Sequence, residues 1–130
     1  MSLSQGQLRE LNTTLRQQRA RLRDELLSRL ESSDDASLQN VAGQVRDWGD
    51  ESLASTVAEH NLMLADRLGD EINAVEDALN EIDQGEYGRC GGCGSDIAFE
   101  RLRAEPTAKL CIQCQKTQER LQAETESPTL

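Results

Sequence analysis

Leucines at helical spacing dominate the first quarter of the chain. They stand at Leu8, Leu11, Leu15, Leu22, Leu26 and Leu30. Intervals of mostly three and four residues are typical of an amphipathic helix, here over roughly residues 4–31. Ser4 and Gln7 have the spacing of a capping box, which marks its start. Gln18 occupies the seam position between Leu15 and Leu22, and its amide needs a hydrogen-bond partner or water if it is buried.

A second apolar stripe runs through the middle of the chain. It consists of Leu53, Val57, Leu64, Leu68, Ile72, Val75, Leu79 and Ile82. The stripe predicts a long helix from about Asp50 to Gln84, after which Gly85 supplies the left-handed residue that ends it. Between the stripes, residues 31–52 collect Ser, Asp and Gly, so we expect a polar turn region, with room for a short helical turn from Leu38 to Val45.

Two long amphipathic helices joined by a polar turn bury their stripes most simply against each other as an antiparallel coiled coil. Aromatic residues make up only 2% of the chain, which suits helix seams built from Leu, Ile, Val and Ala. We therefore expect a mainly α fold, with a long antiparallel coiled-coil hairpin over residues 1–84 whose tip lies near 31–52. A small head and a C-terminal helix follow over residues 85–130. Because the hairpin is intramolecular, a monomer is expected.

The charge distribution limits the partners. The net charge is −10, composed of +3 over residues 1–30, −13 over 31–86 and zero over 87–130. DNA binding draws its affinity from clustered Lys and Arg, so direct DNA binding is not expected as the main activity. The chain begins without an apolar run of signal-peptide length and has no stretch of about 18 apolar residues. A soluble, cytoplasmic protein without membrane contact is expected.

All the cysteines fall in two Cys-x2-Cys pairs. Cys90 and Cys93 form the first pair, and Cys111 and Cys114 the second. Two such pairs present four thiolates to one point and predict a closed tetrahedral shell around one structural Zn²⁺, with no open position for catalysis. The alternative is a set of redox-active or free thiols, but a redox motif usually needs a single pair with an activated thiolate.

Other residues near the cysteines fit a metal-bound head. Glycines such as Gly92 and Gly94 around the first pair suit a tight knuckle turn. The apolar residues Ile97, Phe99, Leu102 and Leu110 can pack a miniature core around the metal. The segment from Ile112 to about Glu124 is predicted to be helical, with Leu121 as a later packing contact.

Together these residues resemble the DksA/TraR C4-type zinc-finger family. The similarity lies in Gly-Glu-Tyr-Gly-Arg-Cys-Gly-Gly-Cys-Gly from Gly85, in Pro106-Thr107-Ala108, and in Cys111-Ile-Gln-Cys114. It covers the zinc region from about Ile82 to Arg120 closely, and the preceding hairpin by architecture and length. Family members bind RNA polymerase rather than DNA and insert the coiled-coil tip into the secondary channel. The resemblance thus implies RNA polymerase as partner and a transcription regulator that is not an enzyme and has no catalytic residues.

The resemblance also implies which residues act at the tip. Asp47 and Asp50 match the family's Asp-x-x-Asp-x-Ala tip motif, whereas Ser52 departs from its alanine. We expect Asp47, Trp48, Asp50 and Ser52 to contact the partner. Taken alone, the two acids can equally be caps of the second helix, with Asp50 as N-cap. Trp48 can join an interface or fold back onto the coiled coil.

A further departure from the family concerns guanosine tetraphosphate. Family members that respond to this nucleotide use three basic residues, whose positions are Ala74, Glu105 and Gln115 here. Because a polyanion would lose three cationic partners, a regulator without nucleotide dependence is expected. Two other functions remain open: a transcript-cleavage factor that holds a metal ion at the tip through Asp47 and Asp50, and a zinc-stapled protein-interaction adaptor.

Overall fold

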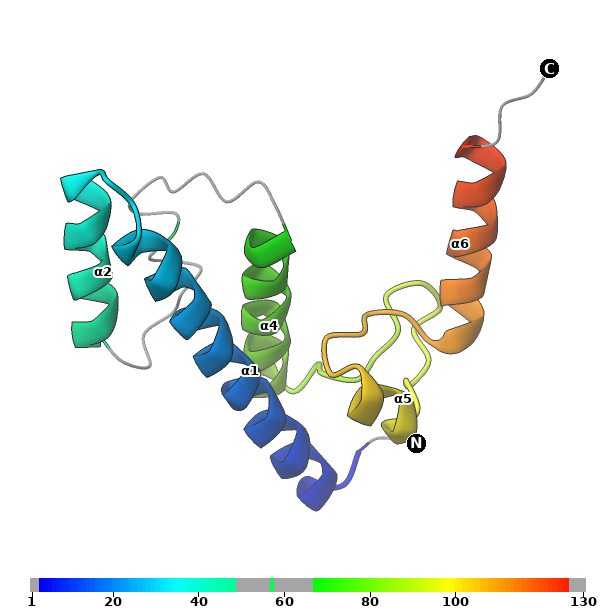
Figure 1. The fold of residues 1–130 in the computed structure, drawn as a ribbon. Coiled ribbons are helices and arrows are strands. Elements are labelled where there is room, and N and C mark those ends of the chain that lie inside the picture. The colour runs from blue at the N-terminus through cyan, green and yellow to red at the C-terminus, as the bar shows by residue number, and fades with distance from the viewer. Residues whose placement is uncertain (1–2, 49–56, 58–66, 127–130) are drawn as a thin grey trace.

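The computed structural model describes residues 3–48, 57 and 67–126, and its described part is mainly helical. The helices are α1 (Gln5–Glu31), α2 (Ala36–Trp48), α4 (Arg67–Gln84), α5 (Phe99–Ala104) and α6 (Ile112–Glu126). Figure 1 shows α1, α2 and α4 grouped at one end, with the cysteine-bearing loops, α5 and α6 at the other. None of the described helices is long and apolar enough to cross a membrane.

Helix α1 begins at the predicted capping box. The Ser4 hydroxyl accepts a hydrogen bond from the Gln7 backbone N–H at 3.1 Å, and the Ser4 N–H donates to Gln7 Oε1 at 3.0 Å. Five of the predicted stripe leucines are buried, namely Leu11, Leu15, Leu22, Leu26 and Leu30. The boundaries agree with the expected helix over residues 4–31. The Oε1 atom of Gln18 is buried without a hydrogen-bond partner in the described structure.

Helix α4 lies antiparallel to α1 and packs its apolar face on the leucine stripe (Figure 1). The buried residues on this face include Leu68, Ile72, Val75, Ala78 and Leu79. The helix ends as predicted at Gly85, which has a φ of +76° and donates its N–H to the Ile82 carbonyl at 3.2 Å. Of the earlier part of the predicted long helix, Val57 is helical, while Leu53 and Leu64 lie outside the described residues. The hairpin of the expected fold class is present.

Helix α2 contains the short helical turn allowed from Leu38 to Val45, but it is longer than that turn and replaces most of the polar turn region expected over residues 31–52. It spans 13 residues and turns back along α1 (Figure 1). Val41, Ala42 and Val45 repeat at helical spacing and are buried in the same apolar cluster as the α1 leucines. Asp35 stabilises the start, because its carboxylate accepts a hydrogen bond from the Ser37 N–H at 2.9 Å. Burial of this apolar face outweighs the turn propensity of the neighbouring Ser, Asp and Gly.

A second apolar cluster forms the head. Leu11 of α1 is buried together with Cys90, Ile97 and Leu102, and the partly buried residues around them are Leu3, Tyr87, Phe99, Ala108, Leu110, Cys111 and Cys114. The miniature core predicted from the sequence is therefore present. Tyr87 also packs against the first cluster, so it belongs to both.

Helix α6 leaves the head and extends away from the rest of the chain (Figure 1). Residues 116–124 are all exposed. Leu121 is 56% exposed, so the packing contact predicted for it is wrong. Its spacing after the fourth cysteine allowed a contact, but the direction of α6 carries the side chain away from the head core.

Candidate metal centre

Four cysteine sulfur atoms converge in the head. Those of Cys90, Cys93, Cys111 and Cys114 all lie within 4.8 Å of one another. The Cys93 and Cys111 sulfurs are 3.9 Å apart. A tetrahedral ion with metal–sulfur bonds of about 2.3 Å requires sulfur–sulfur distances of about 3.8 Å. The Cys93–Cys111 distance meets that requirement, and the other sulfurs are close enough to share one ion.

The local fold explains how the first pair reaches the cluster, with Cys90 buried and Cys93 at the surface. Cys90 is held by an antiparallel bridge between Arg89 and Asp96, the single β-type pairing in the described residues. The Cys90 N–H donates to the Ser95 carbonyl at 2.7 Å, and Gly94 turns the chain with a φ of +76°. A side chain at Gly92 would place its Cβ 3.0 Å from the Cys114 sulfur, so any larger residue would crowd the cluster there.

Backbone N–H groups surround the sulfurs and join the two pairs. The N–H groups of Gly92 and Cys111 each donate to the Cys90 sulfur at 3.3 Å. Cys114 donates its N–H to the Cys111 sulfur at 3.5 Å, at the start of α6. Amides aimed at sulfur stabilise thiolates and orient metal ligands. This preorganised shell favours ionised cysteines.

The pKa values of the cysteines follow from these hydrogen bonds. The N–H of Cys111 is the largest of several donor effects that lower the pKa of Cys90 to about 6. Hydrogen bonds from Ser95 lower the pKa of Cys93. In contrast, the neighbouring thiols raise the pKa of Cys114 to about 12, and Cys111 has the largest effect among them. Four thiolates this close cannot all be charged without a cation, and a bound dication removes the conflict. The cluster therefore fits one structural zinc ion.

Polar contacts that no sequence pattern indicated brace the head, and one of them ties it to α4. Arg101 Nε donates to the Leu110 carbonyl at 2.8 Å, next to the second cysteine pair. The Tyr87 hydroxyl donates to the Pro106 carbonyl at 2.7 Å, and burial of this phenol raises its pKa. Lys109 forms an ion pair with Asp77 of α4 at 3.1 Å. The two partners of each contact lie 9–32 residues apart, so no local sequence pattern predicts these contacts.

The predicted tip residues are described only in part. Asp47 is exposed near the C-terminal end of α2. Trp48 is the last residue of α2, and its side chain lies outside the described part of the chain. Asp50 and Ser52 also lie outside the described residues. A further exposed carboxylate, Asp34, stands in the turn between α1 and α2, where the run of Ser and Asp in the sequence could have drawn attention to it.

Comparison with known proteins places this geometry in a family. Residues 85–120, which include all four cysteines, match the model of the prokaryotic dksA/traR C4-type zinc finger. Over 112 residues the chain is 30% identical to the RNA polymerase-binding transcription factor DksA of Salmonella typhimurium, covering 86% of this chain and 71% of that protein. The chain belongs to the DksA/TraR family.

The similarity of this DksA/TraR protein to its relatives extends beyond the zinc finger. DksA of Escherichia coli matches with the same identity and coverage. The structure of transcription factor DksA2 from Pseudomonas aeruginosa is similar with a TM-score of 0.58 and 26% identity, over 92% of this chain and 88% of that one. The hairpin and the four-cysteine head are therefore both shared with the family.

Proposed function

We propose that this DksA/TraR protein is a cytoplasmic transcription regulator that binds RNA polymerase. The observation that carries the proposal is the extent of the similarity: it spans 86% of the chain, hence the hairpin as well as the head, and the relatives concerned are RNA polymerase-binding factors by name. In this proposal residues 1–84 are the binding arm and residues 85–130 the head. Cys90, Cys93, Cys111 and Cys114 hold zinc as a structural clamp, without catalysis.

We further propose that the arm enters the secondary channel of the polymerase and that Asp47, Trp48, Asp50 and Ser52 act there. The exposure of Asp47 at a helix end supports this role, because its carboxylate is available to donors on a partner. The same position excludes a function in the apolar core. The four cysteines of the head lie far along the sequence from these residues, and the zinc that they hold serves to anchor the arm.

In vitro transcription with purified polymerase tests the tip. The informative variant is Asp47→Asn/Asp50→Asn. The matched control is Asp34→Asn, which removes an exposed carboxylate before the N-terminal end of α2, outside the tip motif. We expect the double variant to bind polymerase but to lose its effect on initiation, while the control acts like the wild type. Equal effects of all three proteins at saturating concentration would rule out the tip mechanism. A cleavage assay on stalled complexes checks the alternative in which Asp47 and Asp50 hold a metal ion.

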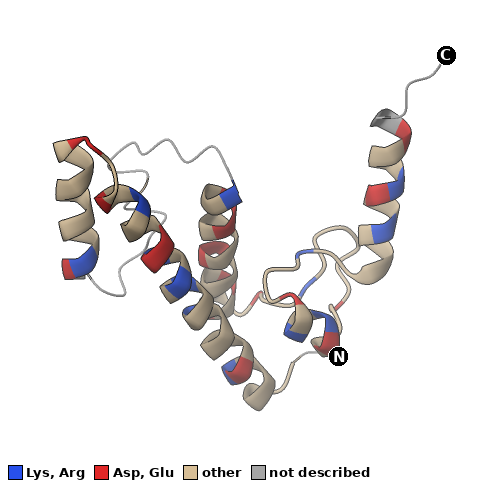
Figure 2. Cartoon of the chain, viewed as in Figure 1, with Lys and Arg blue, Asp and Glu red and all other residues tan. Residues whose placement is uncertain are grey.

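We also propose that the regulator acts without guanosine tetraphosphate. A groove of about 590 Å³ lies between α1 and α4 and reaches the head. It includes Ala74 and Glu105, two of the three positions where nucleotide-responsive relatives are basic. The charged residues lining it are Arg21, Glu25, Arg67, Asp70, Glu71 and Glu105. Figure 2 shows acidic residues along α4, so a polyanion here would meet mostly carboxylates.

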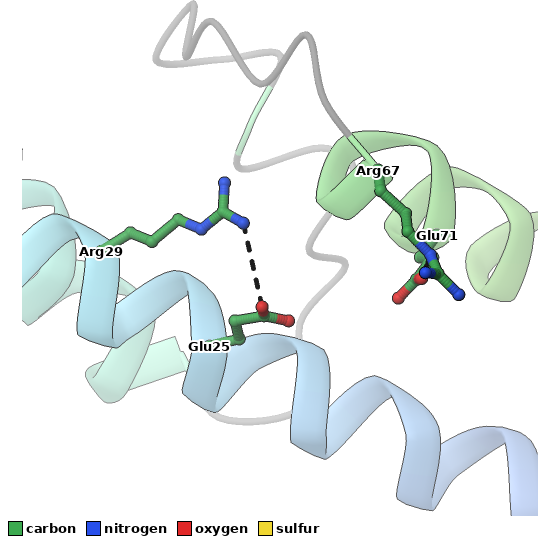
Figure 3. A network of polar contacts seen from close by, with 4 residues as sticks. All are labelled: Glu25, Arg29, Arg67 and Glu71. Atoms are coloured by element: carbon green, nitrogen blue, oxygen red, sulfur yellow. Dashed lines mark hydrogen bonds and ion pairs between the residues drawn. The ribbon is translucent and has the colours of Figure 1, made fainter.

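Ion pairs occupy cations in and beside this groove. In Figure 3, Arg67 pairs with Glu71 on α4 at 2.7 Å, and Arg29 pairs with Glu25 on α1 at 3.8 Å. The third position, Gln115, lies in α6 and donates to Glu119 at 2.9 Å. Calorimetry of the polymerase complex should detect no nucleotide bound at this site, and transcription should be the same with and without the nucleotide. Nucleotide crosslinked to Ala74, Glu105 or Gln115 would overturn the proposal.

A further inference from the structure

Residues 3–4, which precede α1, lead from that helix toward α5 (Figure 1). Leu3 is partly buried in the head cluster, although it lies before the first residue of the helix. A Cβ atom built on Gly88 would lie 3.2 Å from Leu3 Cδ1 and 3.6 Å from Leu102 Cδ1. Leu3 therefore fills the space between the chain at Gly88 and the fully buried Leu102 of α5.

Gly88 belongs to the hydrogen-bonded frame of the head. Its carbonyl accepts a hydrogen bond from the Ile97 N–H at 2.7 Å, next to the bridge between Arg89 and Asp96. Its φ of +89° is in the region that favours glycine. A contact with Gly88 is thus a contact with the frame of the zinc site. Through this contact Leu3 connects that frame to the base of α1.

Other contacts at this joint hold the head less firmly. Arg103 pairs with Glu10 at 3.6 Å and Lys109 with Asp77 at 3.1 Å, but all four side chains are about half exposed. Exposed ion pairs contribute little to stability. Leu11 also packs into the joint, but it is part of the leucine stripe of α1. Tyr87 also packs against both apolar clusters, but its hydroxyl holds the Pro106 carbonyl. Leu3 is therefore an apolar contact that can be removed without changing a helix, a side-chain hydrogen bond or a zinc ligand.

We propose that Leu3 is a positioning residue that fixes the orientation of the zinc head against the base of the hairpin. Together with the proposed function, this contact sets the direction of the arm when both parts of the protein engage the polymerase. The orientation itself is a property of the free protein and can be measured without the partner.

Hydrogen exchange on the full-length zinc-bound protein tests the contact. We expect Leu3→Ala to speed exchange of α5 amides and of the first turns of α1 about tenfold, the order expected for losing part of a leucine's burial. Zinc content and exchange in α4 should stay unchanged, and Leu3→Met, which keeps the volume, should restore protection. Uniformly faster exchange, or no change at the joint, would overturn the proposal.

Two glycine variants provide a matched comparison. Gly88→Ala and Gly85→Ala both place alanine at a positive φ, but nothing lies within 4 Å of the Cβ at Gly85. Only Gly88→Ala should speed amide exchange at the joint. Combining it with Leu3→Ala should speed exchange little further, because both variants disturb the same contact between Leu3 and Gly88. Equal effects of the two glycine variants, or additivity in the double variant, would refute a role for Leu3.

Polymerase binding is then measured separately. Leu3→Ala should raise the concentration needed for half-maximal effect on transcription, and Leu3→Met should not. If the wild type failed to bind polymerase, the proposed function would be wrong while the exchange result at the joint stood. If the exchange result held but Leu3→Ala matched the wild type in transcription, the contact would fix the head without setting the direction of the arm.

Discussion

Replacing Gln18 by leucine should stabilise the hairpin. The Oε1 atom of this glutamine is buried without a partner, between two leucines of the α1 stripe. A buried acceptor that loses its bond to water costs about 1–3 kcal/mol. Leucine removes that cost and adds apolar surface beside Leu22 and Val75, which also line the groove. Because the glutamine side chain is only partly buried, we expect a gain of about 1–2 kcal/mol in the free energy of unfolding.

The assay is urea unfolding followed by circular dichroism, with zinc in excess so that the head stays loaded. The midpoint should rise while the slope stays constant, which separates a stability change from a change in the unfolded state. For a chain of this size, each kcal/mol raises Tm by about 3–6 °C. The matched control is Gln17→Leu, the same substitution at an exposed neighbouring position, which should change stability by less than about 0.5 kcal/mol.

Two outcomes would refute this reasoning. If Gln18→Leu were no more stable than the wild type, the unpaired amide would not be a cost in the native state. If Gln17→Leu produced the same gain, the effect would come from helix propensity rather than from the seam.

Three other perturbations follow from the fold. Removing zinc with a chelator should unfold the head but leave much of the helix content of α1, α2 and α4, because Cys90 belongs to the head cluster alone. Circular dichroism should show a partial loss of helix signal that added zinc reverses. A complete loss would contradict separate clusters. Gly92→Ala should weaken zinc binding at least about tenfold, because its Cβ would lie 3.0 Å from the Cys114 sulfur. Competition with a chromophoric chelator measures the zinc affinity, with Gly91→Ala as the control. Gly43→Ala should raise the free energy of unfolding by about 0.5–1 kcal/mol, because its Cβ meets nothing within 4 Å inside α2; an unchanged thermal melt would argue against this helix.

The parts of the fold that local spacing controls could be predicted from the sequence. The cap at Ser4, the α1 stripe and the stop at Gly85 each depend on residues within about one or two helical turns. The zinc site was equally accessible, because two closely spaced cysteine pairs leave few alternatives to a shared metal. Its central geometric requirement, four sulfurs at one point, is met.

The remaining features depend on contacts between distant segments. In α2, Ser and Asp favour a turn while Val41 and Val45 favour a buried helix, and only the presence of α1 as a packing surface decides between them. Leu3 gave no periodic signal, because it precedes its helix and its neighbours Gly88 and Leu102 come some 85 and 99 residues later. The link between Tyr87 and the Pro106 carbonyl is hidden for the same reason.

The outward course of α6 has a practical consequence. Its side chains from Lys116 to Glu124 face solvent, and the helix is attached to the protein at Cys111 and Cys114. Substitutions along this stretch disturb neither apolar cluster, so evolution and engineers can alter it at small energetic cost. A fluorophore or an affinity handle fused beyond Glu124 would therefore report on the protein while leaving hairpin and head intact.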